Sequence, residues 1–301
     1  MLQEKMRDAA ASEPARRAVY LTPENGFKTH LPEVPAHVFT AERDRAFDPA
    51  TGTAFVSLDL SGALETAYPA TTPNMLARYA RIAKGTSLTL AARASGEAWY
   101  ALSGEGSVRK GDDVIEWRKG DAFALPGGAA PTKVTASTDS LLFVVTDEPA
   151  LAWAGTGAPV RPAMQAAHYP AAESLGALDR VHGRTPSEKP TGKFVLFTGP
   201  GLEEAKTITP TISLALNSLE PGGDQPPHRH NAVALTLCLE GERLHSEIDG
   251  ARVDWQKFAV MVTPPLALHS HHNRGAERML SLVAQDGGVF YNARAVGFSF
   301  D

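Results

Sequence analysis

Short apolar runs separated by turn-forming residues dominate the chain. The runs at 140–145 (SLLFVV), 193–197 (KFVLF) and 260–263 (VMVT) are rich in β-branched and aromatic side chains, which is typical of strands. Glycine (26 residues) and proline (22 residues) interrupt the chain at short intervals. The pattern predicts an all-β protein built as an antiparallel sandwich or barrel.

Two segments depart from this pattern. Residues 2–18 are charged and rich in alanine, which indicates an amphipathic helix or a loose arm. Residues 162–180 form a second helical candidate that Pro170 interrupts. Between Ala150 and Pro162 the chain is rich in glycine and proline, as an inter-domain linker would be.

The chain contains an internal repeat. The same offset separates Gly85 from Gly222 and Gly104 from Gly241. An offset one residue longer separates Trp117 from Trp255. The repeat predicts two homologous β units near 40–150 and 190–298, each about as long as one small barrel.

We therefore expect four parts along the chain. They are an N-terminal arm (1–36), an N-terminal barrel (37–150), a linker with a helical segment (151–190) and a C-terminal barrel (191–301).

Composition narrows the classes of partner and compartment. Hydrophobic residues make up 43% of the 301 residues, and the net charge is only -5. This charge argues against a nucleic-acid partner. No run of about 18 apolar residues predicts a membrane span. The single cysteine, Cys238, rules out an internal disulfide and favours the cytoplasm, and its apolar neighbours predict a buried core position.

Candidate metal ligands lie in the second repeat. His228 and His230 are two residues apart, so on a strand their side chains point to the same face. His269 follows after enough chain for a strand, a hairpin and a return strand. Taken alone, His228 and His230 are also compatible with two polar residues of a loop. With His269, Asn273 and the preceding glycine they predict a three-histidine metal site.

These two segments resemble the two signature motifs of the cupin superfamily. The resemblance implies two tandem cupin barrels, that is, double-stranded β-helix or jelly-roll barrels, with a short helical or irregular N-terminal arm. In the first repeat Ala91 and Arg93 stand at the positions of the first two histidines, and Pro131 and Thr132 stand near that of the third. We therefore expect no metal in the N-terminal barrel.

The glutamate of the usual cupin pattern is absent from the second repeat. Ala234 stands at its position, whereas the first repeat keeps Glu97. Three neutral imidazoles leave the full charge of a divalent ion in place and several coordination positions open. Such a site favours Fe(II) with an anionic chelating substrate and a small molecule such as O2. Zinc, manganese and nickel remain alternatives.

A closer resemblance covers the runs PPHRHNAVALTLCLEGE, IDGARVDW and VTPPLALHSHHN. They look like gentisate 1,2-dioxygenase and its salicylate- and hydroxynaphthoate-cleaving relatives, which are Fe(II) bicupins with extradiol-type ring cleavage. The resemblance implies that His271 acts as an acid or base near the substrate. It also implies an aromatic substrate, O2 as co-substrate, and a homodimer or homotetramer.

Substrate-binding positions carry over with several departures. Asn217 stands where relatives have an amide, and Asp286 matches a carboxylate that follows the second motif. Thr236 replaces an arginine that meets a substrate carboxylate in relatives. Leu266 and Leu268 replace two tryptophans. The metal ligands are therefore kept while the substrate pocket is altered and more apolar.

Three functions compete at this point. The first is an Fe(II)-dependent ring-cleaving dioxygenase acting on a gentisate-like hydroxy acid or related phenol. The second is a metal-dependent isomerase or lyase acting on a small acid or sugar. The third is a non-catalytic binding bicupin, which the intact ligand set disfavours because three inward histidines without a metal are costly buried polar groups.

Overall fold

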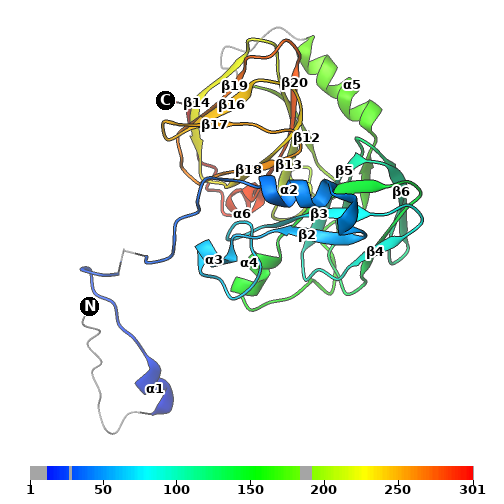
Figure 1. Cartoon of the computed structure of the whole chain (residues 1–301). Helices are drawn as coiled ribbons and strands as arrows, with labels where there is room; N and C mark the ends of the chain where they lie inside the picture. Colours follow the sequence, from blue (N-terminus) through cyan, green and yellow to red (C-terminus); the bar gives the residue numbers. More distant parts are fainter. Residues whose placement is uncertain (1–11, 27–28, 184–191, 301) are drawn as a thin grey trace. The chain divides into compact units, whose positions relative to one another are not determined.

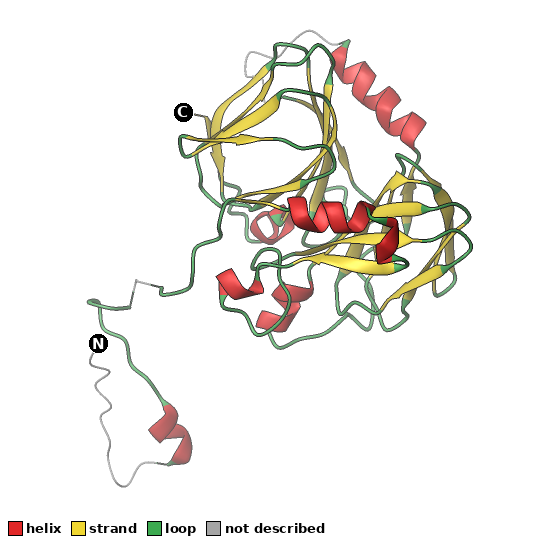
Figure 2. Cartoon of the chain, in the orientation of Figure 1, coloured by secondary structure: helices red, strands yellow, loops and turns green. Residues whose placement is uncertain are grey.

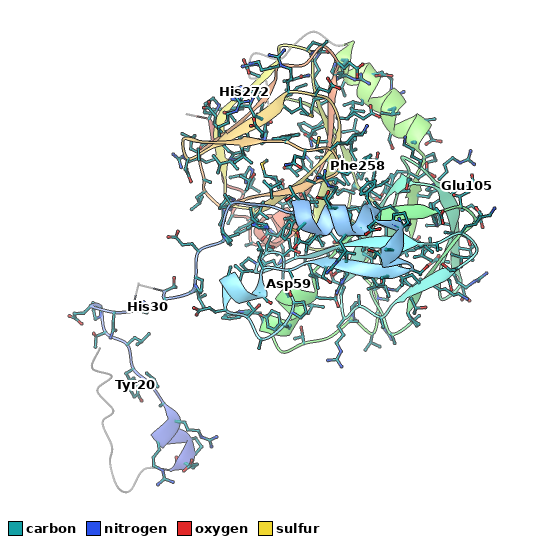
Figure 3. All side chains as sticks on the ribbon, in the orientation of Figure 1. Tyr20, His30, Asp59, Glu105, Phe258 and His272 are labelled. Atoms are coloured by element: carbon teal, nitrogen blue, oxygen red, sulfur yellow. The ribbon has the colours of Figure 1, made fainter. Side chains whose placement is uncertain are left out.

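A computed structural model describes residues 12–26, 29–183 and 192–300 of the chain, which falls into two compact units, 1–33 and 34–301. Among the described residues of the first unit lies a short helix, α1 (Glu13–Arg17). The Ser12 side chain caps its start by accepting a hydrogen bond from the Ala15 N–H. Of the expected helix over 2–18, residues 2–11 lie outside the described residues. Figure 3 labels Tyr20 and His30 in this unit.

The second unit consists of two antiparallel β barrels and a few short helices (Figures 1 and 2). In the N-terminal barrel, a six-stranded sheet has the order β11–β8–β5–β10–β3–β2 and a four-stranded sheet has the order β4–β9–β6–β7. The strands are β2 (Ala54–Leu58), β3 (Leu76–Ile82), β4 (Ser87–Leu90), β5 (Gly96–Ser103), β6 (Glu105–Lys110), β7 (Asp113–Arg118), β8 (Ala122–Pro126), β9 (Thr132–Ala136), β10 (Ser140–Thr146) and β11 (Ala167–Tyr169).

The C-terminal barrel has the same plan. Its six-stranded sheet has the order β1–β18–β15–β20–β13–β12, and its five-stranded sheet has the order β17–β16–β19–β14–β21. The strands are β1 (His37–Val38), β12 (Lys193–Phe197), β13 (Ser213–Leu219), β14 (Asp224–His230), β15 (Ala234–Glu240), β16 (Leu244–Ile248), β17 (Ala251–Asp254), β18 (Val260–Thr263), β19 (His269–Asn273), β20 (Met279–Gln285) and β21 (Phe298–Phe300). The all-β prediction with two barrels is confirmed.

Helices lie between or beside the sheets. They are α2 (Thr40–Phe47), the 3-10 helix η1 (Pro49–Thr51), α3 (Ser61–Leu64), α4 (Glu148–Trp153), α5 (Ala171–His182) and α6 (Gly287–Asn292). The helix expected over 162–180 begins only at Ala171, and residues 162–166 are not helical. The reason is that Pro170 takes the N-cap position, since proline is accommodated at the start of a helix and not inside it. In the described part of the chain, no helix has the length and apolar character needed to span a membrane.

Each barrel is completed at one edge by a short strand from the segment that leads into the other barrel. β1 precedes the N-terminal barrel in sequence but pairs with β18 of the C-terminal barrel. β11 follows the N-terminal barrel in sequence and pairs with β8 at the equivalent edge. The predicted boundaries at 37 and 151 therefore do not coincide with the sheets. β1, at the start of the predicted N-terminal barrel, completes the C-terminal one, and β11, in the predicted linker, completes the N-terminal one. Pairs this short carry no sequence pattern of their own.

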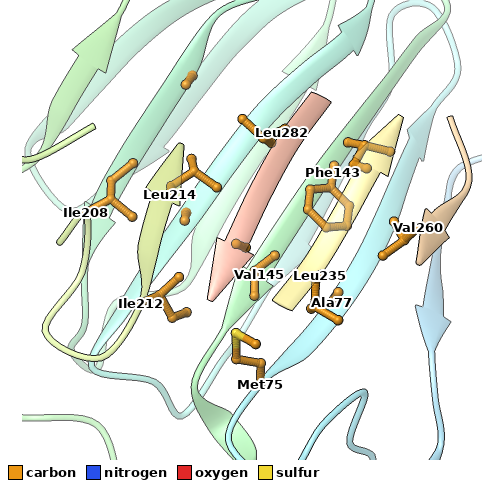
Figure 4. Close-up of a cluster of buried hydrophobic side chains, with 14 of the residues drawn as sticks. Met75, Ala77, Phe143, Val145, Ile208, Ile212, Leu214, Leu235, Val260 and Leu282 are labelled. Carbon is orange, nitrogen blue, oxygen red and sulfur yellow. The ribbon is translucent and has the colours of Figure 1, made fainter. Parts of the chain in front are cut away.

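A shared apolar core joins the two six-stranded sheets. Phe143 and Val145 from β10 pack in one cluster with Leu235 from β15 and Leu282 from β20 (Figure 4). All four side chains are at most 2% exposed. Cys238 lies in a smaller core cluster and is buried, which confirms its predicted structural position; burial raises the pKa of its thiol to about 11.

Side chains fill the interior of the N-terminal barrel. Trp99 stacks on Phe123 with ring centroids 5.8 Å apart. Beside them Glu97 is fully buried and accepts hydrogen bonds from the Lys110 ammonium (2.5 Å), the Trp99 indole (2.9 Å) and the Thr132 hydroxyl (2.9 Å). Thr132 begins β9, the counterpart of β19, where the second barrel has His269. A buried ion pair thus occupies the region in which the other barrel gathers its histidines.

We expect the Glu97–Lys110 pair to matter for stability. Lys110→Met leaves the Glu97 carboxylate buried without its counter-ion and should lower the free energy of unfolding by about 3–5 kcal/mol. Glu97→Leu combined with Lys110→Met should cost much less than the single change. Chemical denaturation measures both, with Lys133→Met on the exposed side of β9 as a control expected to stay within about 0.5 kcal/mol. A Lys110→Met protein as stable as the control would contradict the role of the pair.

Candidate metal centre

Three histidines converge on the inner face of the five-stranded sheet. His228 and His230 belong to β14, and His269 begins β19 directly opposite His228. Their ligand-capable nitrogens all lie within 4.8 Å of one another. The side chains are 3%, 8% and 2% exposed. Alternation along β14 puts its two histidines on one face, as the sequence predicted.

Each of the three rings is oriented by the backbone carbonyl group of a residue two positions away in the sequence. The Nδ1 atoms lie 2.8 Å from the Pro226 carbonyl for His228, 2.7 Å from the Ala232 carbonyl for His230 and 2.9 Å from the Ala267 carbonyl for His269. A carbonyl oxygen only accepts, so each Nδ1 carries a hydrogen and donates it. This assignment puts the lone pair of every ring on Nε2, where His230 faces the Gln285 side-chain amide at 3.2 Å. Such carbonyl contacts are how metal-binding histidines are usually held.

Burial keeps these imidazoles neutral. It is the main cause of the lowered pKa of His228 and His230, and it lowers the pKa of His269 to about 3 with a further contribution from neighbouring His228. Neutral imidazole is the metal-binding form. The three histidines therefore fit a divalent transition-metal ion, with three nitrogen ligands and no carboxylate among them.

A cavity of about 290 Å³ opens in front of the three histidines. Its walls come from the inward-facing residues of β13, β15 and β20 on one side and of β14 and β19 on the other. Apolar side chains such as Phe194, Val283 and Phe298 contribute much of the lining, and no described lining residue is Lys, Arg, Asp or Glu. Within the described lining, the full positive charge open to a ligand is therefore that of a bound metal ion.

The structure brings together some of the predicted substrate-binding residues. Asn217 on β13 and Thr236 on β15 both line the cavity with the three metal-ligand candidates. His271 on β19 also lines it, with its ring centroid 5.5 Å from that of His269. Burial, followed by the neighbouring histidines, lowers the pKa of His271 well below its ordinary value.

Asp286, predicted to contact substrate, is not among the residues that line the cavity. Its carboxylate accepts hydrogen bonds from the Asn74 side chain (2.7 Å) and from the Val233 N–H (2.8 Å). The preceding residue, Gln285, is the last inward-facing residue of β20, so Asp286 points the other way. Through Asn74 its carboxylate is hydrogen-bonded to the segment that leads into β3 of the N-terminal barrel. Burial raises the pKa of this carboxyl group.

Leu266 and Leu268 do not reach the cavity either. Leu266 is 61% exposed and adopts a positive φ of 63°. Leu268 precedes β19, and its backbone exchanges hydrogen bonds with Asp249. Residues 269 and 271 use the inward-facing parity of β19, which leaves position 268 on the other side.

Other residues of the site were not predicted from the sequence. The Gln285 side chain lies 3.2 Å from Nε2 of His230, and Phe298 of β21 stacks against His228 with centroids 5.2 Å apart. Gln285 shares strand parity with Ser281 and Val283, which also line the cavity, so alternation along this strand could have predicted that it faces inward. Phe298 had none, because the C-terminal residues show no strong strand pattern.

A second histidine cluster lies on the outer face of the same sheet. Nitrogens of His245 and His272 lie within 4.8 Å of a Glu247 carboxylate oxygen. The two rings are stacked at 4.6 Å and 22°, so their lone pairs do not point at one ion. Both nitrogens of His272, labelled in Figure 3, already contact side chains, those of Asp224 and Ser270. We therefore place the metal centre on the inner face alone.

Comparison with known proteins agrees with this geometry. Residues 215–284, from β13 to β20, match the family model described as Cupin domain. Gentisate 1,2-dioxygenase 1 from Aquipseudomonas alcaligenes is 31% identical over 88 residues, which are 29% of this chain and 25% of that protein. The 1-hydroxy-2-naphthoate 1,2-dioxygenase from Nocardioides sp. (strain KP7) is 29% identical over 106 residues, 35% of this chain and 27% of that protein. The matched segments thus span about a quarter of these curated relatives.

The fold likeness extends over both barrels. Salicylate 1,2-dioxygenase from Pseudaminobacter salicylatoxidans superposes with a TM-score of 0.74 over 91% of each chain, at 14% identity. Identity this low shows the fold alone. The predicted cupin fold and the predicted resemblance to gentisate- and salicylate-type dioxygenases are both confirmed.

We expect the purified chain to hold one divalent ion, and His228→Ala to abolish its retention. The reason is that two imidazoles retain a divalent ion far less well than three, while the inter-barrel core that stabilises the fold does not involve His228. Metal analysis by mass spectrometry measures the content, and His245→Ala, which removes a buried histidine from the outer face, is the matched control. Full occupancy in His228→Ala, or two ions per chain in the unaltered protein, would contradict this assignment.

Proposed function

We propose that the protein is a ring-cleaving dioxygenase that holds Fe(II) through His228, His230 and His269 and acts on an aromatic hydroxy acid or a related phenol. The observation that carries the proposal is the set of three oriented Nε2 atoms of neutral imidazoles, facing a cavity whose described lining contains no Lys, Arg, Asp or Glu. The gentisate- and hydroxynaphthoate-cleaving relatives support the reaction class.

The donor set favours iron over the alternatives. Three imidazoles in a face-like arrangement leave neighbouring coordination positions open, as in non-haem Fe(II) oxygenases. Fe(II) bound there would supply positions for the two oxygen atoms of a chelating substrate and for O2. Zinc, manganese or nickel in the same site would favour the isomerase or lyase function instead.

The cavity walls provide the remaining parts of an aromatic site. Phe194 and Phe298 offer flat apolar surface to a ring, and Asn217 with Gln285 offers amide groups that orient polar substituents. Excluding water from such a cavity strengthens each of these polar contacts. The chain's own residues therefore bind and orient a ring whose charged group points at the metal.

Activity itself is tested by anaerobic loading with Fe(II) followed by O2 uptake. We expect uptake with at least one member of a panel of gentisate, salicylates, hydroxynaphthoates and aminophenols, and none with the His228→Ala protein. Zinc-loaded protein serves as the second control, because zinc has no redox chemistry. Absence of uptake across the panel with full iron occupancy would contradict the proposed function.

Thr236 should limit the affinity for gentisate. It is 3% exposed and faces the cavity from β15, where it offers a hydroxyl in place of the guanidinium expected in relatives. Thr236→Arg adds a charge-assisted hydrogen bond worth roughly 1.5–3 kcal/mol, or about one to two orders of magnitude in affinity. Steady-state kinetics with gentisate, normalised to bound iron, measures the gain.

Thr236→Met is the matched control for size without charge. It should leave the KM for gentisate unimproved. Equal kinetics in Thr236→Arg and Thr236→Met, together with efficient gentisate turnover by the unaltered protein, would show that position 236 does not limit carboxylate binding.

A further inference from the structure

A fourth histidine, His271, lies beside the three ligand candidates but is held differently. It is directly opposite Ser246 in the pairing of β16 with β19, and the Ser246 hydroxyl lies 2.7 Å from its Nδ1. The Trp255 indole N–H donates to the same hydroxyl oxygen at 2.7 Å. Trp255, Ser246 and His271 thus form one hydrogen-bonded chain that runs from the end of β17 into the cavity.

The direction of these hydrogen bonds follows from what each group is able to donate. An indole nitrogen only donates, so the Ser246 oxygen accepts from Trp255. Ser246 is fully buried, and its hydroxyl hydrogen needs an acceptor. Among the described residues the one acceptor that the structure places against it is Nδ1 of His271. That nitrogen therefore carries no hydrogen, and the ring hydrogen of the neutral imidazole sits on Nε2.

This tautomer is the opposite of the one at the three ligand candidates. Those rings carry their hydrogen on Nδ1 and keep their lone pair on Nε2. His271 directs its lone pair at Ser246 and leaves an Nε2–H, and its side chain lines the cavity. A nitrogen that carries a hydrogen does not ligate a metal, so the ring is kept out of the ligand set although it lies within 6.1 Å of His228, centroid to centroid.

We propose that Ser246 and Trp255 are positioning residues that hold His271 as the Nε2–H tautomer. The hydrogen-bonded chain divides four neighbouring histidines into three metal ligands and one hydrogen-bond donor for an oxygen atom of the ligand in the cavity. The donor role rests on the proposed function, since it assumes an oxygen-bearing substrate at the metal. The tautomer does not depend on it.

Nitrogen NMR of the imidazole rings tests the tautomer directly. The protein is labelled with nitrogen-15 and loaded with diamagnetic zinc, and the His271 signals are identified by their loss in His271→Gln. In the unaltered protein we expect an unprotonated Nδ1 and a protonated Nε2. Ser246→Ala should populate the Nδ1–H tautomer, Trp255→Phe should shift it in the same direction, and Ser246→Thr should keep the original pattern.

Ser270→Ala is the matched control. It removes a buried hydroxyl from the residue next to His271, but that hydroxyl contacts His272 on the opposite face. It should leave the His271 signals unchanged. A hydrogen on Nδ1 of His271 in the unaltered protein, or identical His271 signals with and without the Ser246 hydroxyl, would overturn the proposal.

Ligand binding tests the donor role separately. With zinc bound at one ion per chain, Ser246→Ala should bind salicylate about five- to tenfold more weakly than Ser270→Ala, the loss expected for one hydrogen bond. Equal affinities would overturn the donor role. Failure of O2 uptake across the substrate panel would overturn the dioxygenase proposal and leave the NMR result standing, because the tautomer measurement uses neither substrate nor turnover.

Discussion

The structure depends on a sheet that is buried on both faces. In the six-stranded sheet of the C-terminal barrel, Leu235 and Leu237 face the inter-barrel core, while the alternating residues Ala234 and Thr236 face the cavity. β13 and β20 repeat this alternation. The core between the barrels therefore fixes the backbone of the sheet whose other face forms the wall opposite the histidines. A one-residue slip of any of these strands would exchange core and cavity residues, so its register is strongly specified.

The two barrels show how one fold serves two purposes. Their strand orders match apart from the added β21, and each has an edge strand, β11 or β1, from the segment that leads into the other barrel. One barrel keeps an open interior with three neutral imidazoles. The other fills its interior with stacked aromatic rings and closes the region with the Glu97–Lys110 pair. We interpret the N-terminal barrel as the rigid support against which the cavity-bearing sheet packs.

Much of this could be predicted from local pattern. Strand parity was sufficient to place His228 and His230 on one face, and the repeat was sufficient to predict two barrels. The positions carried over from relatives did less well at strand ends. Leu268 precedes β19 and Asp286 follows β20, and both lie outside the cavity lining, as strand parity with His269 and Gln285 indicates. The Trp255–Ser246–His271 chain was not predictable, because it depends on cross-strand register, which is set by hairpin lengths and by the shared core. The placement of β1 and β11 was equally hidden, since two- and three-residue pairs carry no periodicity.

The central claim is that one metal ion sits among the Nε2 atoms of His228, His230 and His269. Anomalous X-ray scattering from crystals of the metal-loaded protein tests it most directly. The account predicts one strong peak per chain on the inner face of the five-stranded sheet, at about 2.0–2.2 Å from each of the three Nε2 atoms. A peak between His245 and His272, a peak beside Glu97, or direct coordination by His271 would contradict it.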